Sequence, residues 1–379
     1  MKKVVLIPDS FKGTMSSAEI CDITENALRK HFDNLDIVKI PVADGGEGSV
    51  DCFLQAVGGR KVFVKAVDPF FNEIEIFYGL IENDSVAIVE MAACAGLPLV
   101  DENKNPKKAT TFGVGQLILD AIQHGVKKII VGLGGSATND GGAGFVSALG
   151  VKFQNLNGEF FVPTGDTLSQ IAKIDISQLK KNIDGIEFVT MCDIDNPLFG
   201  KNGAAYVFAK QKGANDNCIA LLDDNLRCFA DVVAREIGFS DSSFCGAGAA
   251  GGMGFSMKAF LNSKMQMGIE TVLDTVNFDA IAKDADYIFS GEGKIDSQSL
   301  RGKVVLGVAK RAKALNVPLI AVVGDIGDDI EPCYENGVTA IFSINRVAVP
   351  FKEAKLRAKS DLALTIENVG RFIKTTEKA

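Results

Sequence analysis

Histidine is scarce in this sequence, which has only His31 and His124 among 379 residues. Each falls at the end of a predicted helix, where the negative end of the helix dipole stabilises a partly positive ring. A histidine-based zinc site needs several such residues, and a serine–histidine triad needs one beside its nucleophile. We therefore expect neither kind of site, and a proton acceptor in catalysis must come from another residue type.

Paired cysteines and long apolar runs are missing as well. The eight cysteines include no Cys-x-x-Cys, which predicts free thiols in a reducing compartment rather than a disulfide framework or a zinc site. The apolar run at the N-terminus is too short for a signal peptide, and Glu90 interrupts the best candidate for a membrane span. We expect a soluble, cytoplasmic protein without a membrane partner.

Positive charge is outnumbered, because 40 Lys and Arg against 48 Asp and Glu leave a net charge of −8. We expect no general attraction to nucleic acid, so a polyanion must be bound by glycine amides, a few placed cations or a metal. The chain also lacks Gly-x-x-x-x-Gly-Lys-Ser/Thr, which excludes a P-loop enzyme. Its length predicts two domains, and a monomer and a homodimer both remain open.

Glycine, in contrast, is abundant, and its densest cluster lies within residues 127–150. Residues 129–131 predict a buried strand, and residues 143–149 predict the following helix. The glycines between them let backbone N–H groups approach an anion closely, as at the start of a phosphate-binding helix. The alternative is a tight turn that needs glycine only for its backbone angles. We favour contact with a phosphate or nucleotide, to which Ser136 and Asn139 add polar side chains.

On both sides of this stretch, short β-branched runs alternate with amphipathic segments. Ser16 and Glu19 predict a capping box at the start of the first helix. The predicted strands span residues 4–7, 37–42, 287–290, 319–323 and 340–344, and the predicted helices span residues 16–32, 49–57, 303–315 and 351–374. Several of these strands end in a loop rich in glycine and charged side chains.

Alternating strands and helices predict parallel sheets, with ligands beyond the carboxyl ends of the strands. The middle of the chain has longer strand-like runs and three glycine clusters. These runs cover residues 73–81, 85–91, 186–192 and 204–208. We predict an α/β protein in which a second α/β domain, residues 77–284, is inserted into a Rossmann-like parallel-sheet domain. The latter comprises residues 1–76 and 285–379, and the active site is expected in the cleft between the two domains.

Other loops carry candidate chemistry of their own. Asp193 and Asp195 follow a predicted strand, where two carboxylates can bind Mg²⁺ or supply a base; the alternative is an Asx turn. Residues 291–303 combine carboxylates and cations, which suits a phosphate site with a metal, unless the loop is merely solvated and paired with itself. Residues 246–254 form either an anion-binding nest or a close packing surface. Residues 211–214 read as an ordinary turn before a helix.

Seven motifs in chain order resemble those of the type I bacterial glycerate kinases. They are Pro8-Asp9-Ser10-Phe11-Lys12-Gly13, Ala43-Asp44-Gly45-Gly46-Glu47-Gly48, Gly134-Gly135-Ser136-Ala137-Thr138-Asn139-Asp140-Gly141-Gly142, Asp193-Ile194-Asp195-Asn196-Pro197-Leu198, Gln211-Lys212-Gly213-Ala214, Gly246-Ala247-Gly248-Ala249-Ala250-Gly251-Gly252 and Gly291-Glu292-Gly293-Lys294-Ile295-Asp296. They cover nearly the whole chain, and together they are highly specific. Ala209-Lys210 and Thr111-Phe112 depart from frequent family patterns, but neither pair has a predicted chemical role.

The resemblance implies ATP-dependent phosphorylation of D-glycerate with Mg²⁺, and 2-phosphoglycerate is the product most often associated with this type. It also implies a two-domain α/β fold with the second domain inserted. Phosphoryl transfer needs cradled phosphates, a bridging metal and an oriented hydroxyl.

The residues predicted to meet these needs fall into four groups. The catalytic candidates are Asp193, Asp296, Lys294 and Lys12, of which Asp193 is the favoured base and Asp296 its rival. The candidates for phosphate or nucleotide contact are Ser10, Gly13, Gly134, Gly135, Ser136, Gly291 and Gly293. The candidates for substrate contact are Arg301 and Asn139. The candidates for the metal are Asp44, Glu47 and Asp195.

The main competing hypothesis is an NAD(P)-dependent oxidoreductase that acts on a small hydroxy acid. Residues 132–137 satisfy Gly-x-Gly-x-x-Ala after a strand, which is a weak signal by itself. The next predicted strand, near residues 151–153, ends in Gln154-Asn155 instead of the acidic residue that would bind the ribose. A non-catalytic nucleotide sensor is a third hypothesis, and the surplus of carboxylates and lysines argues against it.

Overall fold

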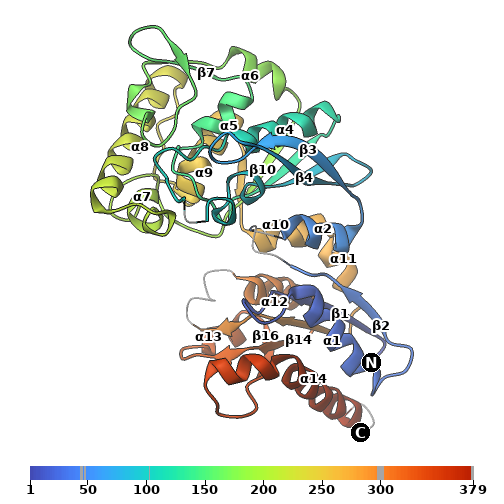
Figure 1. Cartoon of the computed structure of the whole chain (residues 1–379). Helices are drawn as coiled ribbons and strands as arrows, with labels where there is room; N and C mark the ends of the chain where they lie inside the picture. The colour runs from blue at the N-terminus through green and yellow to red at the C-terminus, as the bar shows by residue number, and fades with distance from the viewer. Residues whose placement is uncertain (43–45, 47, 102, 297–302, 377–379) are drawn as a thin grey trace. The chain divides into compact units, whose positions relative to one another are not determined.

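The computed structural model describes residues 1–42, 46, 48–101, 103–296 and 303–376 (Figure 1). The protein is a mixed α/β structure, which confirms the predicted fold class. It divides into two compact units. The first comprises Met1–Asp44 and Ile269–Ala379, and the second comprises Gly45–Gly268. No helix in the described part of the chain is long and apolar enough to span a membrane.

The first unit contains a five-stranded parallel sheet in the order β16-β14-β12-β1-β2. Its strands are β1 (Lys3–Pro8), β2 (Asp36–Lys39), β12 (Tyr287–Gly291), β14 (Leu319–Val323) and β16 (Val338–Ser343). Numbered within the unit, this order is 2-1-3-4-5, one of the two common doubly wound arrangements. The order reverses between β1 and β12, so this is the topological switch point at which such sheets bind ligands.

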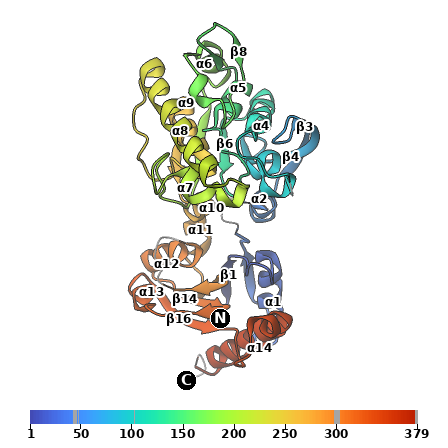
Figure 2. The same ribbon diagram turned by 60° about the vertical axis from the view of Figure 1, so that its left-hand side comes forward.

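Helices cover both faces of this sheet (Figure 2). On one face, α1 (Ser17–Arg29) and α14 (Phe351–Thr376) pack on Val4 and Leu6 of β1. On the other, α12 (Val304–Leu315) packs on the sheet. The predicted capping box of α1 is confirmed, since the Ser16 side chain and the Glu19 side chain each accept the other's backbone N–H. The remaining elements of the unit are α10 (Gly268–Thr275), α11 (Phe278–Ala282), β13 (Lys294–Ile295), β15 (Asp325–Ile326) and α13 (Glu331–Glu335).

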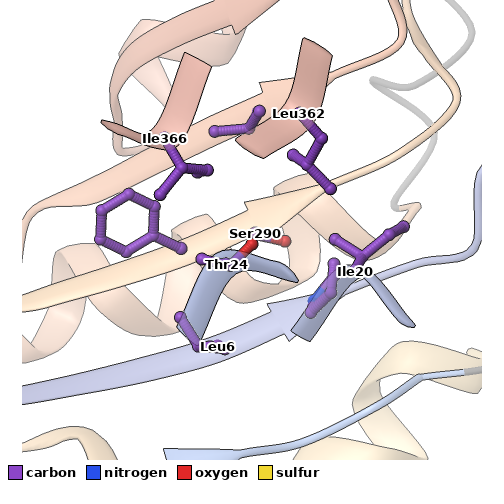
Figure 3. A pocket seen from close by; sticks show the side chains of 9 residues that line it. Leu6, Ile20, Thr24, Ser290, Leu362 and Ile366 are labelled. Carbon is purple, nitrogen blue, oxygen red and sulfur yellow. The ribbon is translucent and has the colours of Figure 1, made fainter. Parts of the chain in front are cut away.

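A small pocket lies between the five-stranded sheet and the helices α1 and α14. Its lining includes Ile20 and Thr24 of α1 and Leu362 and Ile366 of α14 (Figure 3). Its walls are mostly apolar. The Ser290 hydroxyl at its edge already donates a hydrogen bond to the carbonyl of Ile7 at 2.8 Å. Ligand sites combine apolar walls with several converging polar groups. This pocket is therefore a gap in the packing of the core.

The second unit is built on a six-stranded sheet in the order β11-β10-β6-β5-β4-β3. Its strands are β3 (Arg60–Val67), β4 (Glu73–Ile81), β5 (Val86–Glu90), β6 (Lys128–Gly132), β10 (Glu187–Met191) and β11 (Lys264–Gln266). The four from β5 to β11 run parallel, whereas β4 pairs antiparallel with both β3 and β5. A separate antiparallel sheet contains β7 (Lys152–Gln154), β8 (Phe160–Phe161) and β9 (Lys173–Asp175).

The helices of the second unit surround a large core that contains Phe145, Phe229 and Phe255. They are α2 (Ser49–Val57), α3 (Ala92–Ala95), α4 (Phe112–Gln123), α5 (Ala143–Ala148), α6 (Ser177–Asn182), α7 (Ala204–Phe208), α8 (Asp216–Ile237) and α9 (Ala249–Leu261), with the short 3₁₀ helices η1 (Leu97–Leu99), η2 (Leu168–Gln170) and η3 (Lys210–Lys212). Residues 204–208 were predicted as a strand, and this was wrong. Ala204 and Ala205 are fully buried, and the segment packs as α7 against α8 and α9.

The limits of the two units along the sequence differ from the predicted domain boundaries. Residues 45–76 fall in the second unit, because β3 pairs with β4 along its whole length and β4 continues into β5. Residues 269–284 fall in the first unit, because Arg311 of α12 forms ion pairs with Glu270 and Asp274 of α10 and with Asp279 of α11. Strand pairing sets the first boundary, and ion pairs between distant residues set the second. Neither can be predicted from the local composition of the sequence.

Replacing Leu362 with Ala should lower the free energy of unfolding by about 2–5 kcal/mol, since the side chain is fully buried between α14 and the sheet. Leu356→Ala is the matched control, because Leu356 lies on the same helix and is 87% exposed. Urea denaturation followed by circular dichroism measures both. Equal losses in the two variants would contradict the packing of α14 described here.

Candidate functional site

The glycine loop, residues 133–142, begins where β6 ends in the middle of the six-stranded sheet. It is held against the segment after β5, because Leu97 donates its N–H to the Gly135 carbonyl at 2.9 Å and Ala137 donates to Ala95 at 2.8 Å. Gly135 has φ +75° and is exposed, while Gly134 is half-buried. From Ser136 onwards the loop is buried. Only its tip, Gly134 and Gly135, therefore faces solvent.

The start of α5 cannot serve as the predicted anion site, because the protein already uses its N–H groups. The Asp140 carboxylate accepts the N–H of Gly142 at 3.0 Å and of Gly144 at 3.2 Å. It also accepts the N–H and hydroxyl of Thr111, both at 2.8 Å, and Thr111 Oγ1 accepts the N–H of Phe145 at 2.9 Å. Complete burial raises the pKa of Asp140, and these hydrogen bonds act against that rise.

Lys212, at the end of η3, lies beneath the same loop. Its side chain is 2% exposed, and its Nζ donates to Ser136 Oγ at 2.8 Å and to the Thr138 carbonyl at 2.6 Å. Burial lowers the pKa of this amine to about 7, and the nearby Asp140 acts in the opposite direction. Residues 211–214 have the local pattern of an ordinary turn before a helix, which gives no sign of a buried lysine. Only its place in a family motif singled it out.

Asn139 is fully buried, and neither polar atom of its amide has a hydrogen-bond partner among the described residues. Leaving such groups unpaired costs about 1–3 kcal/mol each. Native structures rarely retain this cost without an unseen water, ion or ligand. The observation is compatible with the substrate contact predicted for Asn139, which stays a prediction.

The glycines of residues 246–254 serve close packing, one of the two roles that the sequence left open. Ala250, Gly251 and Gly252 have positive φ and interrupt α9. A Cβ on Gly251 would lie 2.0 Å from the Thr138 carbonyl, and Gly251 accepts the N–H of Gly141 at 3.0 Å. This segment therefore supports the buried half of the glycine loop.

Asp193 and Asp195 are both exposed in the loop after β10. Asp193 Oδ1 accepts the N–H of Gly268, the first residue of α10, at 2.8 Å. Its carboxylate thus accepts a hydrogen bond from a residue 75 positions further along the chain. The predicted role of Asp193 as a base and that of Asp195 at a metal both stay predictions.

In the first unit, the predicted residues gather at the switch point between β1 and β12. Pro8 lies opposite Gly291 in the sheet, and Asp9 donates its N–H to the Gly291 carbonyl at 2.8 Å. The loops that follow these strands, 9–14 and 292–296, are therefore adjacent. They contain the predicted residues Ser10, Lys12, Gly13, Gly293, Lys294 and Asp296.

Within these loops, Lys12, Gly13, Gly293 and Lys294 are exposed, and Lys294 pairs with Asp296 at 3.3 Å. Gly291 has a structural explanation that the sequence did not reveal. A Cβ there would lie 2.1 Å from the carbonyl of Val322 on the neighbouring strand. Packing of the sheet thus requires this glycine, whether or not a ligand also approaches it.

Three predicted site residues, Asp44, Glu47 and Arg301, lie outside the described residues. Among the residues that are described, no group of three or more His, Cys, Asp or Glu side chains is arranged to hold a metal. Mg²⁺ in kinases commonly takes one or two carboxylates and completes its shell with phosphate oxygens and water. The exposed carboxylate of Asp195 fits that chemistry.

The topology also bears on the oxidoreductase hypothesis. A dinucleotide-binding unit places the strand after its glycine loop beside the first strand, where its acidic end reaches the ribose. Here the next strand, β7, pairs with β8 and β9 in a different sheet. The sheet neighbours of β6 are β5 and β10. The geometry that a dinucleotide requires is therefore not formed at this loop.

Comparison with known proteins decides the family. The model of the glycerate kinase family matches residues 4–374. The chain belongs to the glycerate kinase family. It is 42% identical to a glycerate kinase of Bacillus cereus over 97% of both chains, and 40% identical to the glycerate 2-kinase of Escherichia coli over 90% of both. The oxidoreductase alternative has no support among these relatives.

A solved structure agrees with this result. The crystal structure of a proposed glycerate kinase 2 from Salmonella typhimurium LT2 is 38% identical and covers 100% of both chains, with a TM-score of 0.89. Members of this family are phosphotransferases, so the resemblance of the seven motifs is confirmed at the level of the family.

Replacing Gly135 with Ala tests whether the exposed tip of the glycine loop contacts a ligand. A Cβ there would obstruct the approach of the backbone to a phosphate, and we expect kcat/KM to fall by about 10²-fold. Gly125→Ala is the control, because Gly125 has φ +83° and open space around it and so carries the same backbone strain. Steady-state kinetics and thermal melts of both variants are compared. Equal values of kcat/KM in the two variants would show that no ligand contacts this tip.

Proposed function

We propose that the protein transfers the γ-phosphoryl group of ATP to the 2-hydroxyl of D-glycerate with the help of Mg²⁺, yielding 2-phosphoglycerate. The match of the glycerate kinase family to residues 4–374 carries this proposal. The choice of hydroxyl is supported by the relative named glycerate 2-kinase, which is 40% identical.

The chemistry of phosphoryl transfer agrees with the side chains at the loops. Catalysis of this kind depends on positioning and on stabilising charge, with a metal that bridges phosphate oxygens when it is bound. The exposed cations Lys12 and Lys294 suit the phosphates or the glycerate carboxylate. We assign the same kind of contact to Arg301, and the metal contact to Asp44, Glu47 and Asp195.

A carboxylate is the proposed acceptor of the hydroxyl proton, with Asp193 preferred to Asp296. His124 is engaged elsewhere, since its Nδ1 lies 3.1 Å from the Tyr78 hydroxyl and 2.9 Å from the Asp120 carbonyl. A carboxylate needs no shift in pKa to be ionised near neutral pH, whereas an exposed lysine is protonated there. The bond from Gly268 fixes the orientation of the Asp193 carboxylate.

The activity itself is tested by measuring ADP release. We expect turnover only when ATP, D-glycerate and a divalent metal are all present, and we expect chelation of the metal to stop it. The ³¹P spectrum of the product should be a doublet, because phosphorus on the 2-oxygen couples to one proton. A triplet would place the phosphate on the 3-oxygen. ATP hydrolysis at a rate that does not depend on glycerate, or no turnover at all, would refute the proposed activity.

Asp193→Asn should lower kcat by roughly 10²–10⁴-fold, the usual effect of losing a general base. The amide oxygen can still accept the Gly268 N–H, so the loop should keep its position and nucleotide affinity should change little. Asp296→Asn is measured beside it, because Asp296 is the rival. Near-normal turnover in the first variant and loss in the second would transfer the role to Asp296.

A further inference from the structure

Burying a lysine lowers the stability of a protein, because a buried ammonium loses its hydration. Lys212 is buried, and the proposed kinase chemistry gives it no role. The glycine loop surrounds its amine, which has two acceptors there, Ser136 Oγ and the Thr138 carbonyl. A neutral amine has two N–H donors, and both can be used in this arrangement. An ammonium has three N–H donors and also carries a charge that the buried position solvates poorly.

Few charged groups surround this amine among the residues that the structure describes. Asp140, in the facing loop, is the charged group that acts on it, and four hydrogen bonds already stabilise the Asp140 carboxylate. Lys210, on the same 3₁₀ helix, is exposed. Lys104 approaches the neighbouring Gly213 with its backbone and Cβ. Within the described part of the chain, the amine therefore has little negative charge near it.

An anion at the exposed tip of the loop would supply that charge. Ser136 joins the two places, because it follows Gly135 in the chain and its hydroxyl accepts from Lys212. Asn139, whose buried amide has no partner among the described residues, belongs to the same loop. Its unpaired polar atoms are a second and independent sign that the loop is completed by something bound to it.

We propose that Lys212 is a positioning residue that takes up a proton when the glycine loop binds an oxyanion of the kinase reaction, either a phosphate of the nucleotide or the carboxylate of glycerate. It holds Ser136 and Thr138 in place in the empty site as a neutral amine. It becomes the buried positive charge of the loaded site. The inference rests on the proposed function, since it requires a reactant of the kinase to bind at this loop.

The direction of the effect follows from linkage. Burial lowers the pKa of Lys212 to about 7 in the protein without ligand. A nearby anion favours the charged form and raises the pKa again, so binding and protonation strengthen each other. Above about pH 7 the empty protein must take a proton from solvent in order to bind. Affinity for the anion should therefore fall as the pH rises.

Calorimetric titration in two buffers of different ionisation enthalpy measures this proton directly. The two ligands, a non-hydrolysable ATP analogue with Mg²⁺ and D-glycerate, are titrated separately at about pH 8. One ligand should bind with uptake of a large fraction of a proton, at most about one, since a single amine titrates. The ligand that shows the uptake is the one whose anion lies at the loop.

Lys212→Met should abolish this uptake, because Met keeps the length of the side chain and cannot titrate. Lys210→Met is the matched control, and it should keep the uptake of the wild type. The pH profile adds a second readout. In the wild type, kcat/KM for that ligand should fall about tenfold per pH unit above about pH 7, while kcat stays flatter, and the variant should lack this fall.

Each result has a definite meaning. Binding with heat that does not depend on the buffer would overturn the inference while leaving the proposed function intact. Uptake that persists in Lys212→Met would assign the proton to another group and also overturn it. If that variant does not fold, the wild-type titration and its pH profile still decide. Absence of both binding and turnover would refute the proposed function, and the inference with it.

Discussion

The buried hydrogen bonds that hold the glycine loop are the constraint on which much of the second unit depends. Asp140 ties the loop to the starts of α4 and α5, and Lys212 ties it to η3. Gly251 admits α9 to within contact of the loop backbone. These partners come from four separate parts of the chain. The tip of the loop, with Gly135 exposed and Gly134 half-buried, can face solvent because these hydrogen bonds hold the residues behind it.

In the first unit, sheet topology sets the position of the loops that carry the candidate residues. Its doubly wound strand order reverses between β1 and β12, the position at which such sheets bind ligands, and the loops that follow these two strands lie next to each other. The pairing of Pro8 with Gly291 brings Lys12 and Lys294 to the same edge of the sheet. Both units thus place polar loops beyond the carboxyl ends of parallel strands, where they suit a phosphotransferase.

Glycine illustrates how far the chemistry of one residue type can be interpreted. Gly291 and Gly251 are needed because a Cβ would strike a backbone carbonyl, at 2.1 Å and 2.0 Å respectively. Gly135 has no backbone atom so close, and it is exposed with a left-handed φ. The same residue that packs the interior at two positions thus offers an open backbone at the third. The difference depends on what lies opposite each glycine in the fold.

The sequence by itself indicated the fold class, the family and several of the helices and strands. Strands β4 and β14 and helix α2 have the predicted limits, and the capping box at Ser16 formed, because side chains within a few residues of one another set these features. Only the tertiary structure decided the unit boundaries, the helical state of residues 204–208 and the burial of Lys212. The bond from Lys212 to Ser136 spans 76 residues. No local spacing encodes a contact of that length, since it exists only after distant segments have packed together.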